Sequence, residues 1–168
     1  MPLIVSVSEF KNMVSTRETD AMLELRLQGI EALIRQYTNN NFQNRNIRSI
    51  SYVENGKIWD LHPLIKLNDT IQVSESLYND GVYTYNDSLI LTDEPRILVT
   101  KVIYPADLKV GVIKLLKWSL ENQDKVGVAS ETISRHSVTY FDQNGDNDLL
   151  GYPKALVSFL QPYVKARF

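Results

Sequence analysis

The segment 19–39, TDAMLELRLQGIEALIRQYTN, constrains the fold most, because its apolar residues recur with the period of an α-helix. One face of this helix carries five apolar or aromatic side chains: Leu23, Leu27, Ile30, Ile34 and Tyr37. Thr19 or Asp20 is placed to cap the start, and the Asn-rich run that begins at Asn39 is placed to end it. The segment therefore predicts a helix roughly 30 Å long.

This predicted helix is apolar over more of its circumference than a single core requires, which is an arc of about 100°. Beside the first face lie further apolar or small residues: Met22, Leu25, Gly29, Ala32 and Leu33. The pattern leaves two interpretations open. Either the helix is enclosed by its own domain, or one face lies in the core and the other contacts a neighbouring subunit.

A second long helix, predicted from Pro105 to about Asp124, repeats this feature. Its inner stripe is Val110, Ile113, Leu116 and Leu120, and the apolar arc is widened by Leu108, Val112 and Leu115. Two helices of this kind favour an intersubunit surface over full enclosure.

Residues 47–104 have a different pattern, in which β-branched and aromatic residues dominate and apolar spacing alternates. Asn55-Gly56 is a strong hairpin signal. Strands are predicted at 47–53, 57–60, 71–73, 82–85, 89–91 and 97–103. The predicted fold class is α+β: a small helical bundle with an inserted antiparallel β region and a short C-terminal helix that starts near Pro153. We expect one compact domain, with bundle helices in 1–46, the β-rich insertion in 47–104, and the second long helix, a connecting strand and the last helix in 105–168.

Composition excludes several classes of protein. The 168 residues include no cysteine, which removes disulfides, zinc ribbons and thiol catalysis. The net charge is −2 and no basic block is present, so binding of nucleic acid through phosphate neutralisation is not indicated. No apolar run reaches the length of a membrane span, and the N-terminus does not have the pattern of a signal peptide.

No motif predicts an enzyme, a cofactor or a metal centre. His62 and His136 stand in no metal-binding spacing, and Ser130, Glu131 and His136 have no spacing that indicates a hydrolase. The acidic run 142–148 resembles the start of a calcium loop, but its glycine and its last ligand position do not fit. A solvated turn explains the same residues, and cation binding there is left open.

One segment resembles a known protein family. The order of a Leu- and Ile-rich helix, an Asn-rich exit, a β-rich middle, a second helix and then Ser130-Glu-x-Ile-Ser-x-x-Ser-Val-Thr-Tyr140 resembles the head–tail connector proteins of tailed bacteriophages, also called head-completion or portal adaptor proteins. The resemblance covers essentially the whole chain in order, and the β-rich part is longer than in the simplest members.

The resemblance implies a structural protein of the virion, assembled in the cytoplasm of the host bacterium, with no membrane partner. Identical subunits would form a ring, a dodecamer, beneath the portal protein, and would receive the next head-completion or tail-completion protein. DNA would pass through the channel without sequence-specific binding. A closed ring needs two different patches on each subunit.

Two groups of residues follow from this implication. The expected subunit interface comprises Met22, Leu25, Gly29, Leu33, Leu108, Val112, Leu115, Ser130, Glu131, Ile133, Val138 and Tyr140. The expected portal-binding clamp comprises Tyr163, Lys165, Arg167 and Phe168. The rival interpretation is a monomeric ligand- or protein-binding module that uses a tyrosine-rich β surface: Tyr78, Tyr83 and Tyr85.

Overall fold

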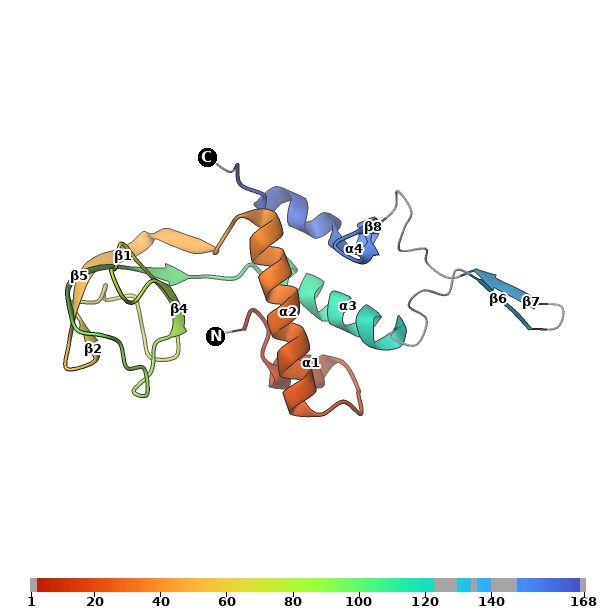
Figure 1. Ribbon diagram of the computed structural model, residues 1–168, viewed down its shortest axis with the longest axis horizontal. Coiled ribbons are helices and arrows are strands. Elements are labelled where there is room, and N and C mark those ends of the chain that lie inside the picture. Colours follow the sequence, from red (N-terminus) through yellow and green to blue (C-terminus); the bar gives the residue numbers. More distant parts are fainter. Residues whose placement is uncertain (1–2, 123–129, 134–135, 140–147, 167–168) are drawn as a thin grey trace. The chain divides into compact units, whose positions relative to one another are not determined.

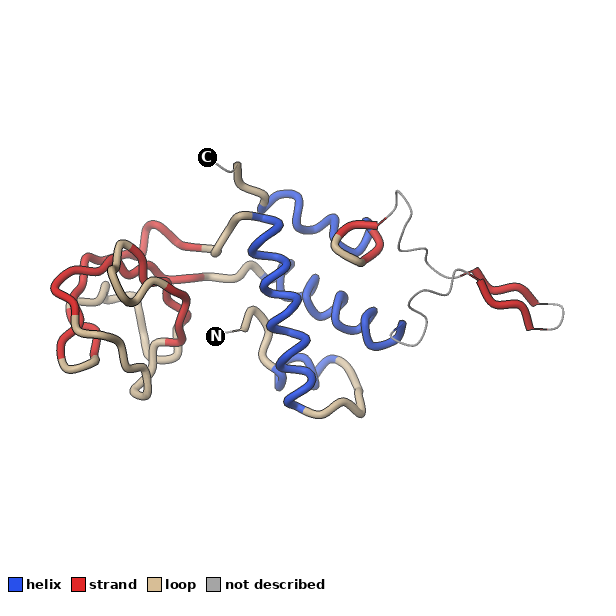
Figure 2. Tube along the Cα trace, viewed as in Figure 1, coloured by secondary structure: helices blue, strands red, loops and turns tan. Residues whose placement is uncertain are grey.

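A computed structural model of the chain describes residues 3–122, 130–133, 136–139 and 148–166. The chain folds into two compact units (Figure 1). The β unit is Asn40–Tyr104, and the helical unit combines Leu3–Asn39 with Pro105–Phe168. Figure 2 shows the contrast between them, since the long strands belong to the β unit and the helices to the other.

The helical unit is built from short and long helices that share one core. In the described residues these are α1 (Val7–Met13), α2 (Asp20–Thr38), α3 (Ala106–Asn122) and α4 (Lys154–Val157), which continues as the 3₁₀-helix η2 (Ser158–Tyr163). Two separate two-stranded sheets complete it, β6 (Ser130–Ile133) with β7 (His136–Thr139), and β8 (Asp148–Leu149) with β9 (Tyr152–Pro153). Its largest fully buried apolar side chains are Ile4, Val5, Phe10, Leu23, Leu27, Ile34, Leu108, Leu116 and Leu160.

The predicted caps of α2 are confirmed. The Thr19 side chain accepts a hydrogen bond from the backbone N–H of Met22 at 3.4 Å, and Asn39 ends the helix in the left-handed conformation. Leu23, Leu27, Ile30 and Ile34 of the predicted inner face are all buried, whereas Tyr37 is only partly buried. Helix periodicity and cap chemistry together located this element correctly.

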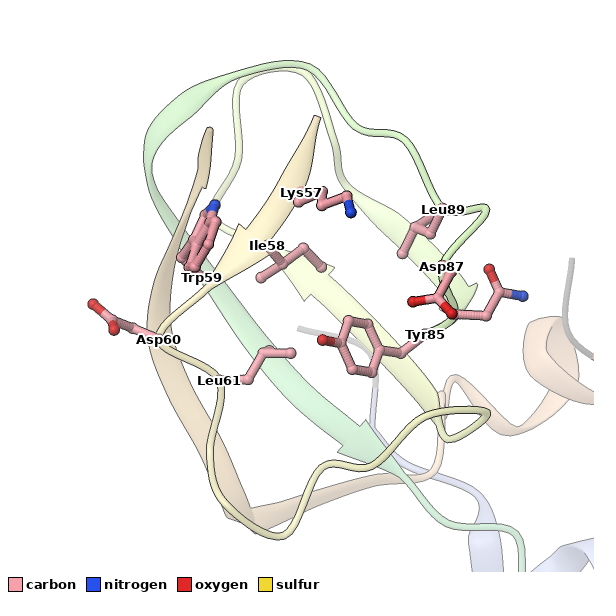
Figure 3. Close-up of a pocket in the computed structure, with 9 residues that line it drawn as sticks. Lys57, Ile58, Trp59, Asp60, Leu61, Tyr85, Asp87 and Leu89 are labelled. Atoms are coloured by element: carbon pink, nitrogen blue, oxygen red, sulfur yellow. The ribbon is translucent and has the colours of Figure 1, made fainter. Parts of the chain in front are cut away.

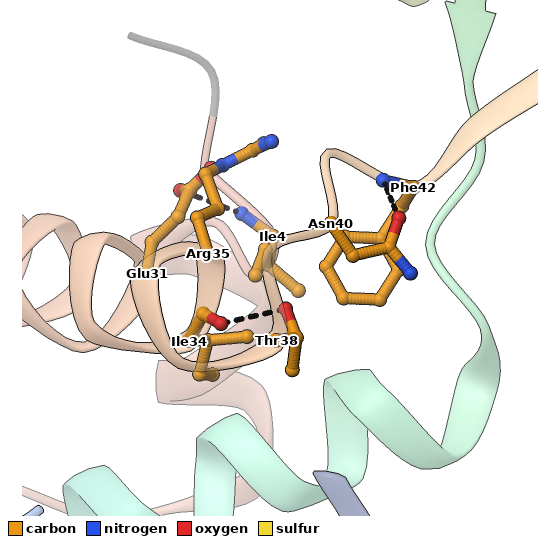
Figure 4. Close-up of polar contacts among 7 residues, drawn as sticks. All are labelled: Ile4, Glu31, Ile34, Arg35, Thr38, Asn40 and Phe42. Carbon is orange, nitrogen blue, oxygen red and sulfur yellow. Dashed lines mark hydrogen bonds and ion pairs between the residues drawn. The ribbon is translucent and has the colours of Figure 1, made fainter. Parts of the chain in front are cut away.

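A buried carboxylate fixes the start of the chain to α2. Glu31 is only 1% exposed, although its place in the sequence is on a polar stripe. Its carboxylate accepts hydrogen bonds from the backbone N–H of Ile4 at 3.2 Å and from Arg35 Nη2 at 2.7 Å (Figure 4). A charge can be buried in this way because both a cation and a backbone donor satisfy it.

The β unit is a curled antiparallel sheet, a half-barrel, with the strand order β2-β1-β5-β3-β4. The strands are β1 (Gln43–Glu54), β2 (Lys57–Trp59), β3 (Thr70–Ser74), β4 (Gly81–Thr84) and β5 (Glu94–Val102). The predicted hairpin at Asn55-Gly56 is confirmed, since both residues have positive φ and Glu54 pairs with Lys57. The strand predicted at 89–91 is wrong, because this segment is irregular.

The curl gives the β unit a hydrophobic core of its own. Alternate residues of β3 and β5 meet on the concave face, among them Ile71, Val73, Ile97 and Val99, each with no exposed surface. Residues outside the strands, such as Ile65 and Leu91, close the core.

The predicted fold class is therefore wrong. The chain is not a helical bundle with a small inserted β region, because five of its strands form one substantial curled antiparallel sheet. The physical reason lies in the alternating apolar residues. Their face is covered by the curl of the same sheet, and it needs no helix to bury it.

Of the helices in the described part of the chain, none has the length and apolar character needed to cross a lipid bilayer.

Candidate interaction surface

The second face of α2 lies at the protein surface. Leu25 is 61% exposed, Met22 43% and Leu33 36%. Between them lie Gly29 and Ala32, which are also exposed, and a Cβ added to Gly29 would have no atom within 4 Å. Large apolar side chains therefore flank a shallow strip of small residues along roughly three turns of the helix. Of the two interpretations of α2, full enclosure is excluded.

Helix α3 behaves differently from the prediction. Leu108, Val112 and Leu115 are at most 2% exposed, so they belong to the core of their own helical unit and offer nothing to a neighbour in this conformation. Val110, which was expected on the inner stripe, is exposed instead. The inner face of α3 is rotated relative to the prediction because Leu108, Gly111, Val112, Leu115 and Leu116 together make its buried stripe.

The segment that carries the family resemblance forms the hairpin β6–β7. Glu131 pairs with Val138, Ser130 with Thr139, and Ile133 with His136. These two strands form a sheet of their own, and a lone two-stranded hairpin is marginal in water. Tyr140 lies outside the described residues.

The C-terminal tail is attached to the helical unit rather than free. The Tyr163 hydroxyl donates to the carboxylate of Asp107 at 2.7 Å, and this hydrogen bond raises the pKa of Tyr163 to about 12. The backbone N–H of Lys165 donates to the Thr38 carbonyl at 2.8 Å, which leaves the Lys165 side chain exposed. The other two clamp residues, Arg167 and Phe168, lie outside the described residues.

Of the two histidines, only His62 has a side chain within the described part of the structure. His62 Nδ1 accepts a hydrogen bond from the backbone N–H of Leu64 at 3.2 Å, which is a local structural role. Within the ranges that the structure describes, no three His, Asp or Glu side chains are grouped so that they could hold an ion. The candidate calcium run, residues 142–147 together with the side chain of Asp148, lies outside these ranges.

The β unit contains a hollow of about 350 Å³ at the mouth of the half-barrel. Its apolar wall consists of Ile58, Leu61, Tyr85 and Leu89, whose side chains point toward one another (Figure 3). Lys57 and Asp87 stand at its rim. The expected tyrosine surface is divided, because Tyr85 lines this hollow while Tyr83 donates its hydroxyl to the Asn79 carbonyl at 3.0 Å.

Sequence reasoning placed Tyr78 on the expected tyrosine surface but missed the exposed apolar group that it forms with Leu77 and Ile90 at one end of the β unit. Leu77 and Ile90 are each 82% exposed, and Tyr78 is 69% exposed. Apolar residues directly beside turn residues, as in Leu77-Tyr78-Asn79-Asp80-Gly81, were the available signal. Only the structure shows that these loops lie at the same end of the sheet.

Comparison with known proteins does not name the family. No protein-family model matches the sequence, and no curated protein matches it significantly.

Proposed function

We propose that this protein is a structural component of the neck of a tailed bacteriophage, a head–tail connector that forms a ring beneath the portal and extends the DNA channel toward the tail. In this proposal it is a virion protein without a catalytic role. Its partners are copies of itself, the portal protein and the next head-completion or tail-completion protein. The ring size expected from the family resemblance is a dodecamer.

The observation that carries the proposal is the exposed face of α2. A helix of a monomeric protein usually has one apolar face, which is buried in the core. A second apolar face that is exposed at the surface is typical of a helix that binds a partner. Leu25 and Leu33 stand on either side of Gly29 and Ala32, so a partner side chain can approach the helix backbone closely. This arrangement is typical of a protein–protein interface with an apolar centre.

Assembly is tested with the full chain, alone and mixed with purified portal rings, by light scattering and negative-stain images. The wild type is expected to form rings in at least one condition, since some rings form only on a template. Leu25→Glu places a charge in the centre of the α2 face and is expected to abolish assembly. Leu67→Glu is the matched control, because Leu67 is similarly exposed, at 55%, but lies in the β unit.

Two results would count against the proposal. If the wild type stays monomeric both alone and with portal rings, the proposed ring is refuted. If Leu25→Glu assembles normally, the α2 face is not the subunit interface.

The portal clamp is the second part of the proposal, and the structure changes how it is tested. Tyr163 is bonded to Asp107, so deleting it would disturb the helical unit itself. The better variant keeps Tyr163, replaces Lys165 by Glu and removes Arg167 and Phe168. Its circular dichroism should match the wild type while co-sedimentation with portal rings is lost. Undiminished co-sedimentation would refute the clamp.

The rival function, a monomeric binding module, is favoured by one observation, the hollow beside Tyr85. Its volume is within the range of small-molecule sites, roughly 300–1,000 Å³. A protein that stays monomeric with the portal, and in which the Tyr85 and Leu89 resonances shift on addition of indole as an aromatic probe, would support this function instead.

A further inference from the structure

The half-barrel is open between its two edge strands, β2 and β4. The chain that follows β4 is tied down at two points. The backbone N–H of Tyr85 donates to the Asp69 carbonyl at 2.8 Å, and the backbone N–H of Leu91 donates to the Gly56 carbonyl at 3.0 Å. Among the residues that the structure describes, no hydrogen bond joins the chain between Tyr85 and Leu91 to β2. The hollow lies in this gap.

One wall of the hollow is the free edge of β2. The two-residue turn before β2 has positive φ at both positions, so Glu54 and Lys57 beside it form a hydrogen-bonded pair. The next pair, Val53 and Ile58, is then non-hydrogen-bonded, and the N–H and C=O of Ile58 point away from β1. In the described part of the chain neither group has a hydrogen-bond partner, because β2 is an edge strand.

The opposite wall is held in place by hydrogen bonds of its own. The backbone N–H of Asn68 donates to the Tyr85 carbonyl at 2.6 Å. Asn86 Oδ1 accepts from the hydroxyl of Ser88 at 2.8 Å and from its backbone N–H at 3.2 Å, and the N–H of Leu89 donates to the Asn86 carbonyl at 3.1 Å. Both apolar side chains of this wall, Tyr85 and Leu89, therefore stand on a braced turn. A site formed in advance costs little ordering entropy when a ligand binds.

The combination of a cavity and a strand edge indicates which ligand fits. The side chains of Ile58, Leu61, Tyr85 and Leu89 surround the cavity, and the free backbone groups of Ile58 lie at its border (Figure 3). An extended peptide satisfies both parts, since its main chain pairs with a strand edge while every second side chain points to the same face. A free aromatic molecule fills the cavity and leaves the edge unpaired.

The charges at the rim favour a basic peptide. The lining residues carry two carboxylates, Asp60 and Asp87, against one ammonium group, that of Lys57. All three are exposed, and in the described part of the chain neither carboxylate is ion-paired. Complementary charge at the rim of a site selects among partners. A lysine or arginine beside the apolar side chain of the peptide meets this requirement.

We propose that the hollow binds an extended segment of a partner protein. The segment adds to β2 as a further antiparallel strand and exchanges two main-chain hydrogen bonds with Ile58. One large apolar side chain of the segment enters the cavity, and a basic residue two positions away, on the same face, lies near Asp60 and Asp87. The site belongs to the β unit alone, so the proposal goes beyond the ring function and does not require it.

The test uses the full chain and the peptide acetyl-Thr-Lys-Val-Trp-Val-Lys-Thr-amide, followed by amide NMR. Addition of the peptide should shift the resonances of Tyr85 and Leu89 and slow hydrogen exchange at the Ile58 amide by roughly tenfold, because that amide gains an acceptor. The same peptide with an N-methyl group on its tryptophan loses the donor that pairs with the edge and should bind roughly tenfold more weakly. Replacement of the tryptophan by alanine should weaken binding at least as much.

A protein variant tests the charge at the rim. Asp87→Lys should lower the affinity for the parent peptide several-fold. Glu24→Lys is the matched control, since it makes the same change of charge at an exposed position of α2 in the helical unit, and it should leave the affinity unchanged. Circular dichroism of both variants checks that the fold is kept.

Each contrary result identifies what is wrong. If the N-methylated peptide binds as well as its parent and exchange at Ile58 is not slowed, strand pairing is refuted and the hollow is a site for a side chain or small molecule alone. If Glu24→Lys weakens binding as much as Asp87→Lys, selection by the rim is refuted. If peptides with tryptophan, phenylalanine or leucine at the central position all leave Tyr85 and Leu89 unshifted at about 1 mM, the site itself is refuted. Ring assembly is measured separately and is unaffected by these outcomes.

Discussion

At the scale of single residues, Gly111 sets how closely η2 approaches α3. A Cβ at this position would lie 2.2 Å from the ring of Phe159, which is inside any allowed contact distance. Glycine is thus present for packing, since its position inside a helix otherwise costs about 1 kcal/mol relative to alanine. The ring of Phe159 occupies the space that a side chain at position 111 would otherwise fill.

This contact yields the first prediction. Gly111→Ala should lower the free energy of unfolding by about 1–3 kcal/mol, because the inserted methyl group displaces a packed ring. Gly29→Ala is the matched control, a glycine in α2 with open space around it, and should raise stability by about 0.5–1 kcal/mol through helix propensity. Urea denaturation of both variants measures the two changes. Equal effects in the same direction would contradict the packing role.

Tyr163 gives the second prediction. Its neutral hydroxyl donates to Asp107, and ionisation would place two negative charges together, so its pKa is raised to about 12 from 10. The folded pKa lies above the unfolded one, so this contact stabilises the tail below pH 10 and is lost as pH rises toward about 12. In a phenolate absorbance titration, Tyr163→Phe should remove a step near pH 12, and Asp107→Asn should move that step down. A step near pH 10 in the wild type, lost in Tyr163→Phe, would refute the bond.

At the scale of elements, the loop 75–80 after β3 depends on one carboxylate, that of Glu94. Hydrogen bonds from Ser76 Oγ, and then from the Leu77 backbone, hold the pKa of Glu94 below its ordinary value of 4.5. The folded pKa is the lower one, so the stabilisation is complete above pH 4.5 and is lost as pH falls through the folded pKa.

The third prediction follows from this sign. Glu94→Gln should be less stable than the wild type at neutral pH, and the difference should shrink as pH falls to about 3 because the wild-type carboxylate becomes protonated. Urea midpoints at several pH values measure it. Asp80→Asn is the comparison variant, since Asp80 accepts a hydrogen bond from the Ser76 backbone in the same loop. A difference that stays constant with pH would contradict the role of the charge.

Sequence periodicity predicted the elements better than their packing. The inner face and both caps of α2 were found because Leu23, Leu27, Ile30 and Ile34 follow the helix period and Asn39 suits a left-handed cap. The same periodicity gave no way to decide which apolar side of α3 is buried. That choice depends on Phe159 packing against Gly111, a contact between residues far apart in the chain.

The fold class was wrong for a related reason. Alternation at Ile71, Val73, Ile97 and Val99 predicted strands with one buried face, but it does not state what covers that face. In this protein, the curl of the sheet itself buries the apolar face of the strands. The exposed position of Leu77 and Ile90 at one end of the sheet could not be predicted either, because these residues come together with the β1–β2 turn only through the pairing of β1, β5 and β3.

At the scale of the whole molecule, the β unit has the features of an independent domain. It has its own core, and its first and last strands pair with each other from Gln43 opposite Val102 onward. The backbone N–H of Ile103 also donates to the Phe42 carbonyl at 3.0 Å, which closes the ends. Few domains of this size are very stable, but a curled sheet with a filled concave face meets the basic requirement.

The fourth prediction is that residues 40–104, expressed alone, fold to the same sheet. A dispersed amide NMR spectrum, with exchange protection in β1, β3 and β5, is the expected result. Val99→Asp in the same fragment is the control that should unfold, since it places a charge in the core. A spectrum of the parent fragment as collapsed as that of the control would show that the sheet needs the helices.

The first and last residues of the β unit lie next to each other, and this has a consequence for protein engineering and for evolution. A module whose entry and exit points touch can be exchanged without moving the ends of its host apart. A short turn in place of residues 43–102 is all that is needed to rejoin the host chain, and a fluorescent or affinity domain with adjacent termini can be grafted at the same junction. If a single recombination event added or removed such a β unit, the contacts that the protein makes would change while its helical unit stayed the same.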